Sequence, residues 1–215
     1  TEDQTLSVDT SGISDADGPA TPTFTYQWLR GGAAISGATA STYTLGDDDV
    51  GTLISVQVSY TDAQGTVETL TSAQTAAVLN INDTPSGLPV ISGTVTEDQT
   101  LSVVTSGISD ADGLTGATFA YQWLRNGSAI IGATGSTYTL GDDDVGALIR
   151  VQVSYTDDQG ALETMTSVQT AAVLNINDAP IGLPVINGTV TEDQTLSVDT
   201  SGISDADGPA TPTFT

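Results

Sequence analysis

The sequence predicts an all-β protein made of tandem sandwich domains, and three observations support this prediction. The stretch TEDQTLSV begins at Thr1, again at Thr96 and again at Thr191, so the chain repeats every 95 residues. That period is too long for one coil of a solenoid and fits a small domain. Each repeat alternates runs rich in Val, Ile, Thr and Tyr with clusters of Gly, Asp, Asn and Pro, and it contains almost no helical periodicity.

The first half of the repeat predicts three strands. TLSV at residues 5–8 is the first, and the loop SDADG follows it. The aromatic residues of FTYQW then alternate along the chain, so they share one face of the next strand. We expect that face to pack in the core rather than to form a platform for sugars. Gly-Gly at 31–32, or Asn-Gly in the second repeat, predicts a tight turn, and STYTL at 41–45 predicts the third strand.

The second half of the repeat contains the clearest alternation. After the acidic corner GDDDVG, apolar residues at every second position from Ile54 to Tyr60 predict a strand with one buried face. The second repeat replaces Ser55 with Arg150 and keeps the apolar set, so we expect Ser55 to lie on a solvated face. TDAQG predicts a turn, and TVETLTSAQTAAVLNI predicts the last strand or pair of strands.

A short linker sets the predicted domain boundaries. NDTPSGLP at 82–89 contains two prolines and a glycine, and LPVISGTV after it predicts the first strand of the next domain. Residues 1–83 are therefore predicted to form a domain without its first strand, and residues 84–178 a complete domain. Residues 179–215 are predicted to be the N-terminal part of a third domain.

The composition favours cations as partners. The chain has 27 acidic residues, three arginines and no lysine or histidine, which gives a net charge of −24. Such a charge disfavours nucleic acid and anionic membranes, and no apolar run reaches the roughly 18 residues of a membrane span. There is no cysteine, so disulfide bonds cannot stabilise the fold. We expect another source of stability, and a bound metal fits an acidic domain.

Enzymatic activity is not expected from this composition. Without His or Cys, the chain has neither an imidazole base nor a thiol nucleophile. A pair of catalytic carboxylates of the glycosidase kind would have to lie in loops that recur in every repeat, which is a poor place for a single active site.

The stretch YQWLRNG…GATGSTYTLGDDDVGALIRVQVSYTD resembles a bacterial immunoglobulin-like domain. Trp123, like Trp28 in the first repeat, stands where such domains bury a tryptophan on the third strand. Asp144-Val145-Gly146 resembles the corner before the penultimate strand. The resemblance implies a Greek-key sandwich. Leu148 stands where a corner tyrosine would be, and the disulfide positions carry other residues, so those two features of the family are not expected here.

The acidic loops also resemble those of cadherin-like repeats. The motifs are TED, DADG, DDD, YTD and NxND, and they recur at fixed positions of the repeat. Tandem units of this kind are similar to the extender repeats of very large bacterial surface adhesins that are secreted with RTX tails. The resemblance implies a secreted or cell-surface protein whose partners are neighbouring repeats of the same chain.

This resemblance implies calcium at the domain junctions, since Ca²⁺ takes 6–8 oxygen ligands. The first predicted ligand set comprises Glu2, Asp47, Asp48, Asp49, Asn80, Asn82, Asp83, Asp110, Asp112 and Asp157. The second comprises Glu97, Asp142, Asp143, Asp144, Asn175, Asn177, Asp178, Asp205 and Asp207. The alternative for any one of them is a turn residue whose side chain bonds to nearby backbone.

The leading functional hypothesis is mechanical: an extender that holds a terminal binding domain away from the cell and is stiffened by calcium. One alternative is a filament subunit that associates head to tail, in which residues 179–215 complete the first domain of a neighbour. Another is a module that binds glycans or proteins, which predicts loops that differ between repeats. The near identity of the loops favours the extender.

Overall fold

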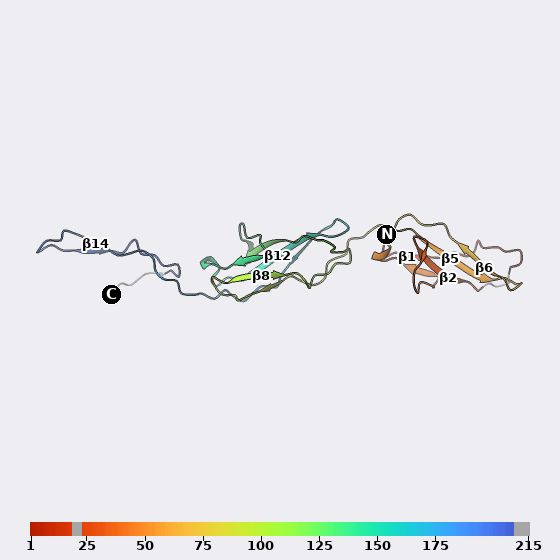
Figure 1. The fold of residues 1–215 in the computed structure, drawn as a ribbon, viewed down its shortest axis with the longest axis horizontal. Coiled ribbons are helices and arrows are strands. Elements are labelled where there is room, and N and C mark those ends of the chain that lie inside the picture. Colours follow the sequence, from red (N-terminus) through yellow and green to blue (C-terminus); the bar gives the residue numbers. More distant parts are fainter. Residues whose placement is uncertain (19–22, 209–215) are drawn as a thin grey trace. The chain divides into compact units, whose positions relative to one another are not determined.

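The computed structural model describes residues 1–18 and 23–208. The chain divides into two compact units (Figure 1). Unit 1 contains Thr1–Thr84 with Asp110–Gly113, and unit 2 contains Pro85–Ser109 and Leu114–Thr215. The regular structure is antiparallel β, as predicted, and the helices in the described part are two short 3-10 turns. The predicted third domain, 179–215, lies in unit 2, except that 209–215 fall outside the described residues.

Unit 1 contains two sheets. The smaller one pairs β1 (Thr5–Ser7) with β4 (Thr42–Thr44). The larger has the order β3-β2-β5-β6, and its strands are β2 (Thr25–Arg30), β3 (Ala33–Ala34), β5 (Ile54–Thr61) and β6 (Val67–Thr71). A 3-10 turn, η1 (Asp47–Asp49), lies between β4 and β5. The first four strands predicted for this repeat are therefore present within about two residues of their predicted bounds, whereas the last predicted stretch, 66–81, forms a strand only over β6.

Unit 2 repeats this arrangement with one more strand. Its four-stranded sheet has the order β10-β9-β12-β13, from β9 (Ala120–Arg125), β10 (Ser128–Ala129), β12 (Ile149–Thr156) and β13 (Leu162–Thr166). Its second sheet has the order β11-β8-β7, from β7 (Val90–Ser92), β8 (Thr100–Val104) and β11 (Thr137–Thr139). The turn η2 (Asp142–Asp144) corresponds to η1. A separate ribbon pairs β14 (Val185–Asn187) with β15 (Ser197–Asp199).

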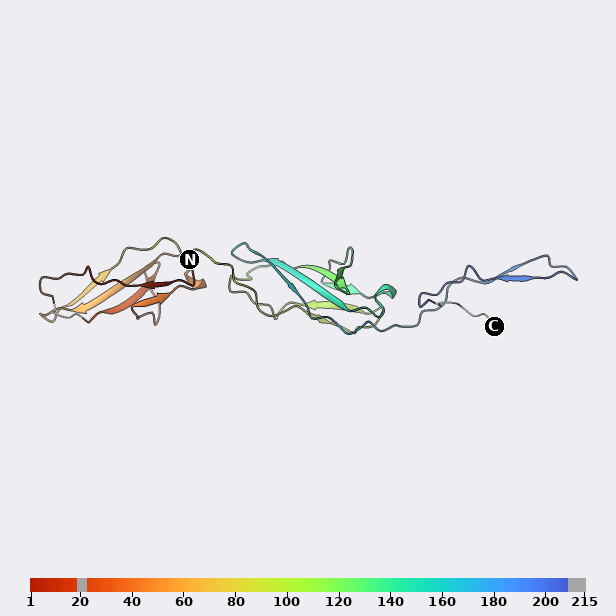
Figure 2. The ribbon, with the colours of Figure 1, turned by 180° about the vertical axis from the view of Figure 1, so that it is seen from behind.

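The predicted aromatic core is confirmed in both units. Trp123 is fully buried among Leu101, Val151 and Val153, which come from both sheets of unit 2. Figure 2 shows the ribbon from behind, with the two larger sheets of unit 2 in green and cyan. The indole N–H of Trp123 donates to the carbonyl of Gly135 at 2.9 Å, so its one polar group is satisfied. Trp28 lies in the same position in unit 1. A layer of apolar side chains between two sheets is the arrangement that alternating strands are expected to form.

The structure corrects the prediction that Ser55 lies on a solvated face, because Ser55 is only 4% exposed. The segment 72–75 runs beside this part of β5: Ile54 N–H donates to the Thr75 hydroxyl, and Val56 N–H to the Ser72 hydroxyl. The hydroxyl oxygens of Ser72 and Thr75 thus accept these N–H groups in place of the backbone carbonyls of a regular ladder. These hydrogen bonds bring the segment 72–75 against β5. The half-buried Arg150 occupies the matching position in unit 2.

Candidate metal centres

A carboxylate cluster lies within unit 1, and we call it cluster 1. Glu2, Asp47 and Asp83 each place one carboxylate oxygen within 4.8 Å of the other two. Oxygen ligands surround Ca²⁺ at about 2.3–2.6 Å, so oxygens bound to one ion lie at most about 5 Å apart. The spacing of cluster 1 therefore fits a single hard cation. All three residues belong to the predicted ligand set.

Backbone hydrogen bonds fix the turn that contains Glu2. The N–H of Glu2 donates to the carbonyl of Leu79, and the N–H of Asp3 donates to the carbonyl of Leu45. Asp3 adopts a left-handed φ of 61°, which allows the tight turn at this point. These two hydrogen bonds join the turn to Leu79, near the end of the repeat, and to Leu45, which lies two residues before Asp47 at the start of η1.

The DADG loop of the second repeat also belongs to unit 1. Asp112 is 4% exposed, and its Oδ2 accepts a 2.6 Å hydrogen bond from the backbone N–H of Asp83. Asp110 accepts a hydrogen bond from the N–H of Asp112 at 3.1 Å. The loop therefore adds two more carboxylates beside cluster 1, as the predicted ligand set requires.

Two buried oxygens of unit 1 have no hydrogen-bond partner. One is Oε2 of Glu2, a residue only 1% exposed, and the other is Oδ1 of Asn80. The other oxygen of Glu2, Oε1, accepts a hydrogen bond from the N–H of Ile81. A buried carboxylate oxygen without a donor costs about 1–3 kcal/mol or more, whereas a bound cation would satisfy it. These oxygens therefore support a cation site on grounds independent of the number of acidic residues.

Unit 2 contains an equivalent cluster, cluster 2. Glu97, Asp142 and Asp178 meet the same 4.8 Å criterion, and Glu97 is again 1% exposed. Glu97 accepts a hydrogen bond from the N–H of Ile176 at 3.1 Å, the counterpart of the Glu2 contact with Ile81. Two copies of one geometry indicate that the arrangement is a property of the repeat.

The third repeat contributes Asp207 to the surroundings of cluster 2. Asp207 Oδ2 accepts a 2.6 Å hydrogen bond from the N–H of Asp178, and its Oδ1 accepts another from the side-chain amide of Asn175. Asp205 accepts from the N–H of Asp207 at 3.1 Å. The backbone hydrogen bonds to the DADG loop of the third repeat thus match those to the DADG loop of the second repeat.

Desolvation, together with neighbouring negative charges, raises the pKa of three of these carboxyl groups. Desolvation raises the pKa of Asp83 most, followed by the charges of Asp47 and Asp112. The pKa of Asp178 is raised by desolvation, then by Asp142 and Asp207. The N–H of Ile176 lowers the pKa of Glu97, but desolvation and the proximity of Asp142 together outweigh it, so that pKa is raised.

The acidic triplets do not act as a unit. A 3-10 helix has three residues per turn, so consecutive side chains point in three different directions. The first residue of each triplet joins a cluster, while the side chains of the second, Asp48 and Asp143, are 88% exposed. The third residues, Asp49 and Asp144, are fully buried. Only one of the three carboxylates predicted at each corner therefore enters the cluster.

Asp49 and Asp144 have a structural role in place of the predicted metal ligation. Asp144 Oδ1 accepts from Nε of Arg125 at 2.7 Å, and its Oδ2 accepts from the Tyr138 hydroxyl and the Gly141 N–H. The bond to Asp144 raises the pKa of Arg125. Asp49 has the same partners in unit 1. Both oxygens of each carboxylate are engaged, so neither is free for a cation.

The remaining predicted ligands lie in other environments. The side-chain amides of Asn82 and Asn177 donate to the carbonyls of Asp83 and Asp178, respectively. Asp157, in unit 2, is 6% exposed; its Oδ1 accepts from the N–H groups of Gln159 and Ala161, and its Oδ2 is buried without a partner. Neither cluster 1 nor cluster 2 contains it. Among the described residues, Asp157 is therefore a predicted ligand that does not lie in a group of three converging carboxylates.

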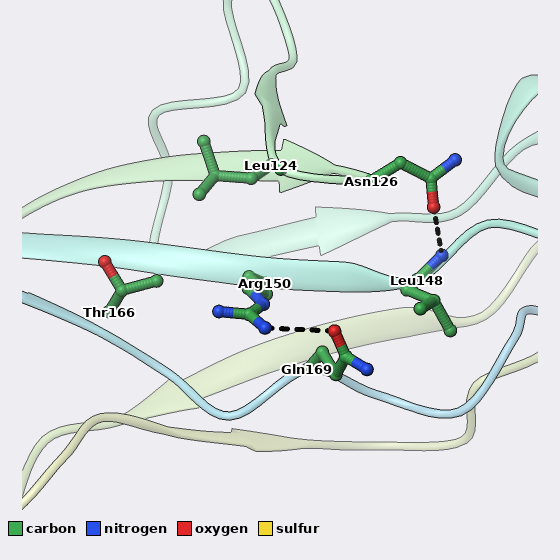
Figure 3. A pocket seen from close by; sticks show the side chains of 7 residues that line it. Leu124, Asn126, Leu148, Arg150, Thr166 and Gln169 are labelled. Atoms are coloured by element: carbon green, nitrogen blue, oxygen red, sulfur yellow. Dashed lines mark hydrogen bonds between the residues drawn. The ribbon is translucent and has the colours of Figure 1, made fainter.

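A pocket of about 370 Å³ lies on unit 2 beside β9 and β12 (Figure 3). Arg150 projects into it and donates to Oε1 of Gln169 at 3.0 Å, and Oδ1 of Asn126 accepts from the N–H of Leu148. The first repeat has Ser55 and Gly31 at the positions of Arg150 and Asn126. The pocket is therefore not a common feature of the repeats, unlike the clusters.

Comparisons with known proteins do not assign the chain to a family. No protein-family model matches it, and no curated protein matches it. No helix in the described part of the chain has the length and apolar character of a membrane span. The geometry of the clusters therefore carries the functional argument.

Proposed function

We propose that this chain is an extender segment of a large bacterial cell-surface adhesin, in which immunoglobulin-like sandwiches follow one another and each repeat binds calcium through its carboxylate cluster. The observation that carries this proposal is the buried Glu2, with one oxygen unpartnered and the other accepting from the N–H of Ile81, the residue before the linker. Glu97 provides the same contact in the next repeat.

Calcium suits these clusters better than other common cations. The side chains of each cluster are carboxylates, which are hard oxygen ligands, and the chain has no Cys or His to select zinc or copper. Ca²⁺ accepts 6–8 oxygens in flexible geometry, whereas Mg²⁺ demands a near-ideal octahedron. Three carboxylates and the neighbouring Asp112 supply several of these oxygens, and water can supply the rest.

The stiffening role follows from which backbone segments the clusters hold. In unit 1, residues 81–83 contribute one N–H bonded to Glu2, another bonded to Asp112, and the carboxylate of Asp83. A cation bound by cluster 1 would restrain this linker further, because several of its ligands belong to or contact that segment. Without a cation, repulsion among the carboxylates would loosen it.

The repetition of the site favours an extender over a receptor. About 80% of positions are identical between residues 1–95 and 96–190, and the cluster residues are unchanged. A ligand-binding module would be expected to vary its recognition residues, and the lining of the pocket at Arg150 is among the features that vary here. A module that binds glycans or proteins there remains the second candidate function, and loss of binding in an Arg150→Ser variant would test it.

Calorimetry tests the calcium site directly. Millimolar Ca²⁺ added to the EDTA-treated chain should raise its melting temperature, because a ligand at 100 times its Kd stabilises a protein by about 2.7 kcal/mol. A double variant, Glu2→Gln with Glu97→Gln, should lose the increase, while Asp48→Asn should keep it. An unchanged melting curve in the unmodified protein would contradict the proposal.

Small-angle scattering tests the mechanical part separately. The radius of gyration should change when EDTA removes calcium, and it should recover when calcium is restored. A radius that does not respond, in a sample whose melting temperature does, would leave a calcium site without a stiffening role.

A further inference from the structure

A bulge in unit 2 places two residues of the segment after β13 opposite one residue of β12. The backbone N–H groups of Ser167 and Thr170 both donate to carbonyls of β12. Between these two hydrogen bonds, Val168 and Gln169 oppose the single residue Arg150. A bulge of this kind bends the strand and changes the direction of a side chain. Here Oε1 of Gln169 accepts a 3.0 Å hydrogen bond from a terminal nitrogen of Arg150.

The pocket at this bulge is lined by apolar groups and by hydrogen-bond donors. Leu124 and Leu148 contribute apolar surface, Asn126 and Gln169 contribute amides, and Thr166 contributes a hydroxyl. None of the described residues that line it is Asp or Glu, although the chain has 27 acidic residues. Its volume of about 370 Å³ lies at the low end of the range of small-molecule sites, about 300–1,000 Å³. The lining therefore suits a small ligand that is rich in acceptors.

Arg150 is a cation without a carboxylate partner in the described part of the chain. The ion pairs found there belong to Arg30 and Arg125. Arg150 bonds instead to the neutral amide of Gln169, and Figure 3 shows its other terminal nitrogen pointing away from that amide. A guanidinium group presents a planar fork of donors that matches the two oxygens of a carboxylate. Arg150 thus keeps donors for a carboxylate ligand.

The two amides beside Arg150 also keep their nitrogen donors. Oδ1 of Asn126 accepts from the N–H of Leu148, and Oε1 of Gln169 accepts from Arg150. These bonds use the oxygen of each amide and leave its NH₂ group for a ligand. An aliphatic acid would offer these donors no acceptor, whereas the hydroxyl and ring oxygens of a sugar would. The lining therefore favours an acid with a sugar body.

The first repeat has the same bulge but not the same chemistry. In unit 1 the N–H groups of Ser72 and Thr75 donate to carbonyls of β5, so Gln74 and its neighbour oppose Ser55. Ser55 is only 4% exposed, and Gly31 stands at the position of the asparagine. The bulge and its glutamine are thus common to both repeats, whereas the guanidinium and the second amide belong to the second repeat alone.

We propose that the pocket at Arg150 binds an acidic sugar through its carboxylate group. The guanidinium of Arg150 pairs with the carboxylate, and the amides of Asn126 and Gln169 donate to oxygens of the sugar. Leu124 and Leu148 contact its C–H groups. This proposal rests on the second candidate function, ligand binding at this pocket, and it does not depend on calcium in the clusters.

The net charge of the chain opposes an anionic ligand only at long range. A charge of −24 repels anions from the molecule as a whole. In physiological salt the Debye length is about 8 Å, so charges farther away than this are largely screened. Since none of the described residues that line the pocket is acidic, the nearest charge that the ligand meets there is the guanidinium. Binding is therefore best measured in physiological salt.

Heteronuclear NMR of the 215-residue chain tests the proposal. D-glucuronate should shift the side-chain amide signals of Asn126 and Gln169 in a saturable manner. Gln74, the counterpart of Gln169 in the first repeat, is the internal control and should not shift. D-glucose, which lacks the carboxylate, and acetate, which lacks the sugar, should each bind about tenfold more weakly or worse. No saturable shift with glucuronate, or equal affinity for glucuronate and either control, would overturn the proposal.

Two variants test the assignment of the acid to Arg150. Arg150→Ser introduces the residue that the first repeat has at this position, so the variant should fold. It should bind glucuronate about tenfold more weakly or worse and keep any calcium-dependent increase in melting temperature, which separates this test from that of the clusters. Conversely, Gly31→Asn with Ser55→Arg should create a second site, reported by the amide of Gln74. Unchanged glucuronate binding in Arg150→Ser, or no shift of Gln74 in the folded double variant, would overturn the assignment.

Discussion

The backbone N–H of Asp83 donates a 2.6 Å hydrogen bond to the carboxylate of Asp112, and Asp178 makes the same bond to Asp207. In both cases the linker residue keeps its own carboxylate for a cluster. The DADG loop of one repeat thus binds the linker that follows the preceding repeat. A motif that is weak by sequence alone acquires a definite partner in the structure.

Replacing Glu2 with Gln should weaken calcium binding at cluster 1. The amide keeps the shape of the side chain and an oxygen for the N–H of Ile81, but it removes a charge from the site. We expect the affinity of cluster 1 to fall about tenfold or more, or about 1.4 kcal/mol. Isothermal titration calorimetry would show one weakened and one unchanged class of sites. Asp48→Asn is the control, because that side chain is exposed.

Replacing Asp144 with Asn should lower stability and leave calcium affinity unchanged. Asp144 is fully buried and bonds to Arg125, Tyr138 and Gly141, so the variant breaks a charged network. Loss of one partner of a buried pair costs about 3–5 kcal/mol, and the low end is expected since Arg125 is partly exposed. Tyr138→Phe should cost about 1 kcal/mol. Chemical denaturation measures both, and a calcium affinity lowered by Asp144→Asn would contradict the structural role.

The metal-free protein should become more stable as the solution is acidified. The pKa values of Asp83, Asp178 and Glu97 are raised above 3.8, 3.8 and 4.5. A carboxyl group whose pKa is raised in the folded state adds to the free energy of unfolding when it is protonated. This contribution is complete at a pH below the reference pKa, and it is lost as the pH rises through the raised pKa.

In EDTA, the melting temperature should therefore increase on going from neutral pH into that window. With calcium the sign should reverse, because protonation removes the ligands. Melting curves against pH, with and without calcium, provide the measurement. Identical pH profiles in the two conditions would argue against a cation at the clusters.

Replacing Gly87 with Ala should destabilise unit 2 strongly. Gly87 has φ +81°, and an added Cβ would lie 2.0 Å from the carbonyl oxygen of Gly107. The control is Gly132→Ala, where φ is +78° but nothing lies within 4 Å. The control should cost about 1–2 kcal/mol for the left-handed backbone alone. Gly87→Ala should cost clearly more, and thermal denaturation measures both losses of stability. Equal losses in the two variants would contradict the close approach of Gly87 to Gly107.

The sequence was sufficient for the strands. Alternation from Ile54 to Tyr60 predicts β5, the aromatic residues around Trp28 predict the buried face of β2, and Asn126-Gly127 predicts the turn before β10. These elements depend on periodicity and on local turn chemistry, which are properties of neighbouring residues. The turn is confirmed by left-handed φ angles of 49° and 84° at Asn126 and Gly127.

The candidate site was only partly predictable. Sequence identified Glu2, Asp47 and Asp83 among many acidic residues, but it could not separate Asp47 from Asp48 and Asp49. The 3-10 turn places the side chain of Asp47 in a cluster, exposes that of Asp48 and directs that of Asp49 to the partly exposed Arg30. The burial of Ser55 was also missed, because hydroxyl groups at Ser72 and Thr75 bring a distant segment alongside β5.

The sequence by itself therefore determined the period of 95 residues, the β class and the pool of acidic ligands, since each is written in local patterns. Only the tertiary structure decided which carboxylates converge, and it left Oε2 of Glu2 buried without a partner. Convergence and burial depend on contacts between residues far apart in the chain, and one-dimensional periodicity does not encode them.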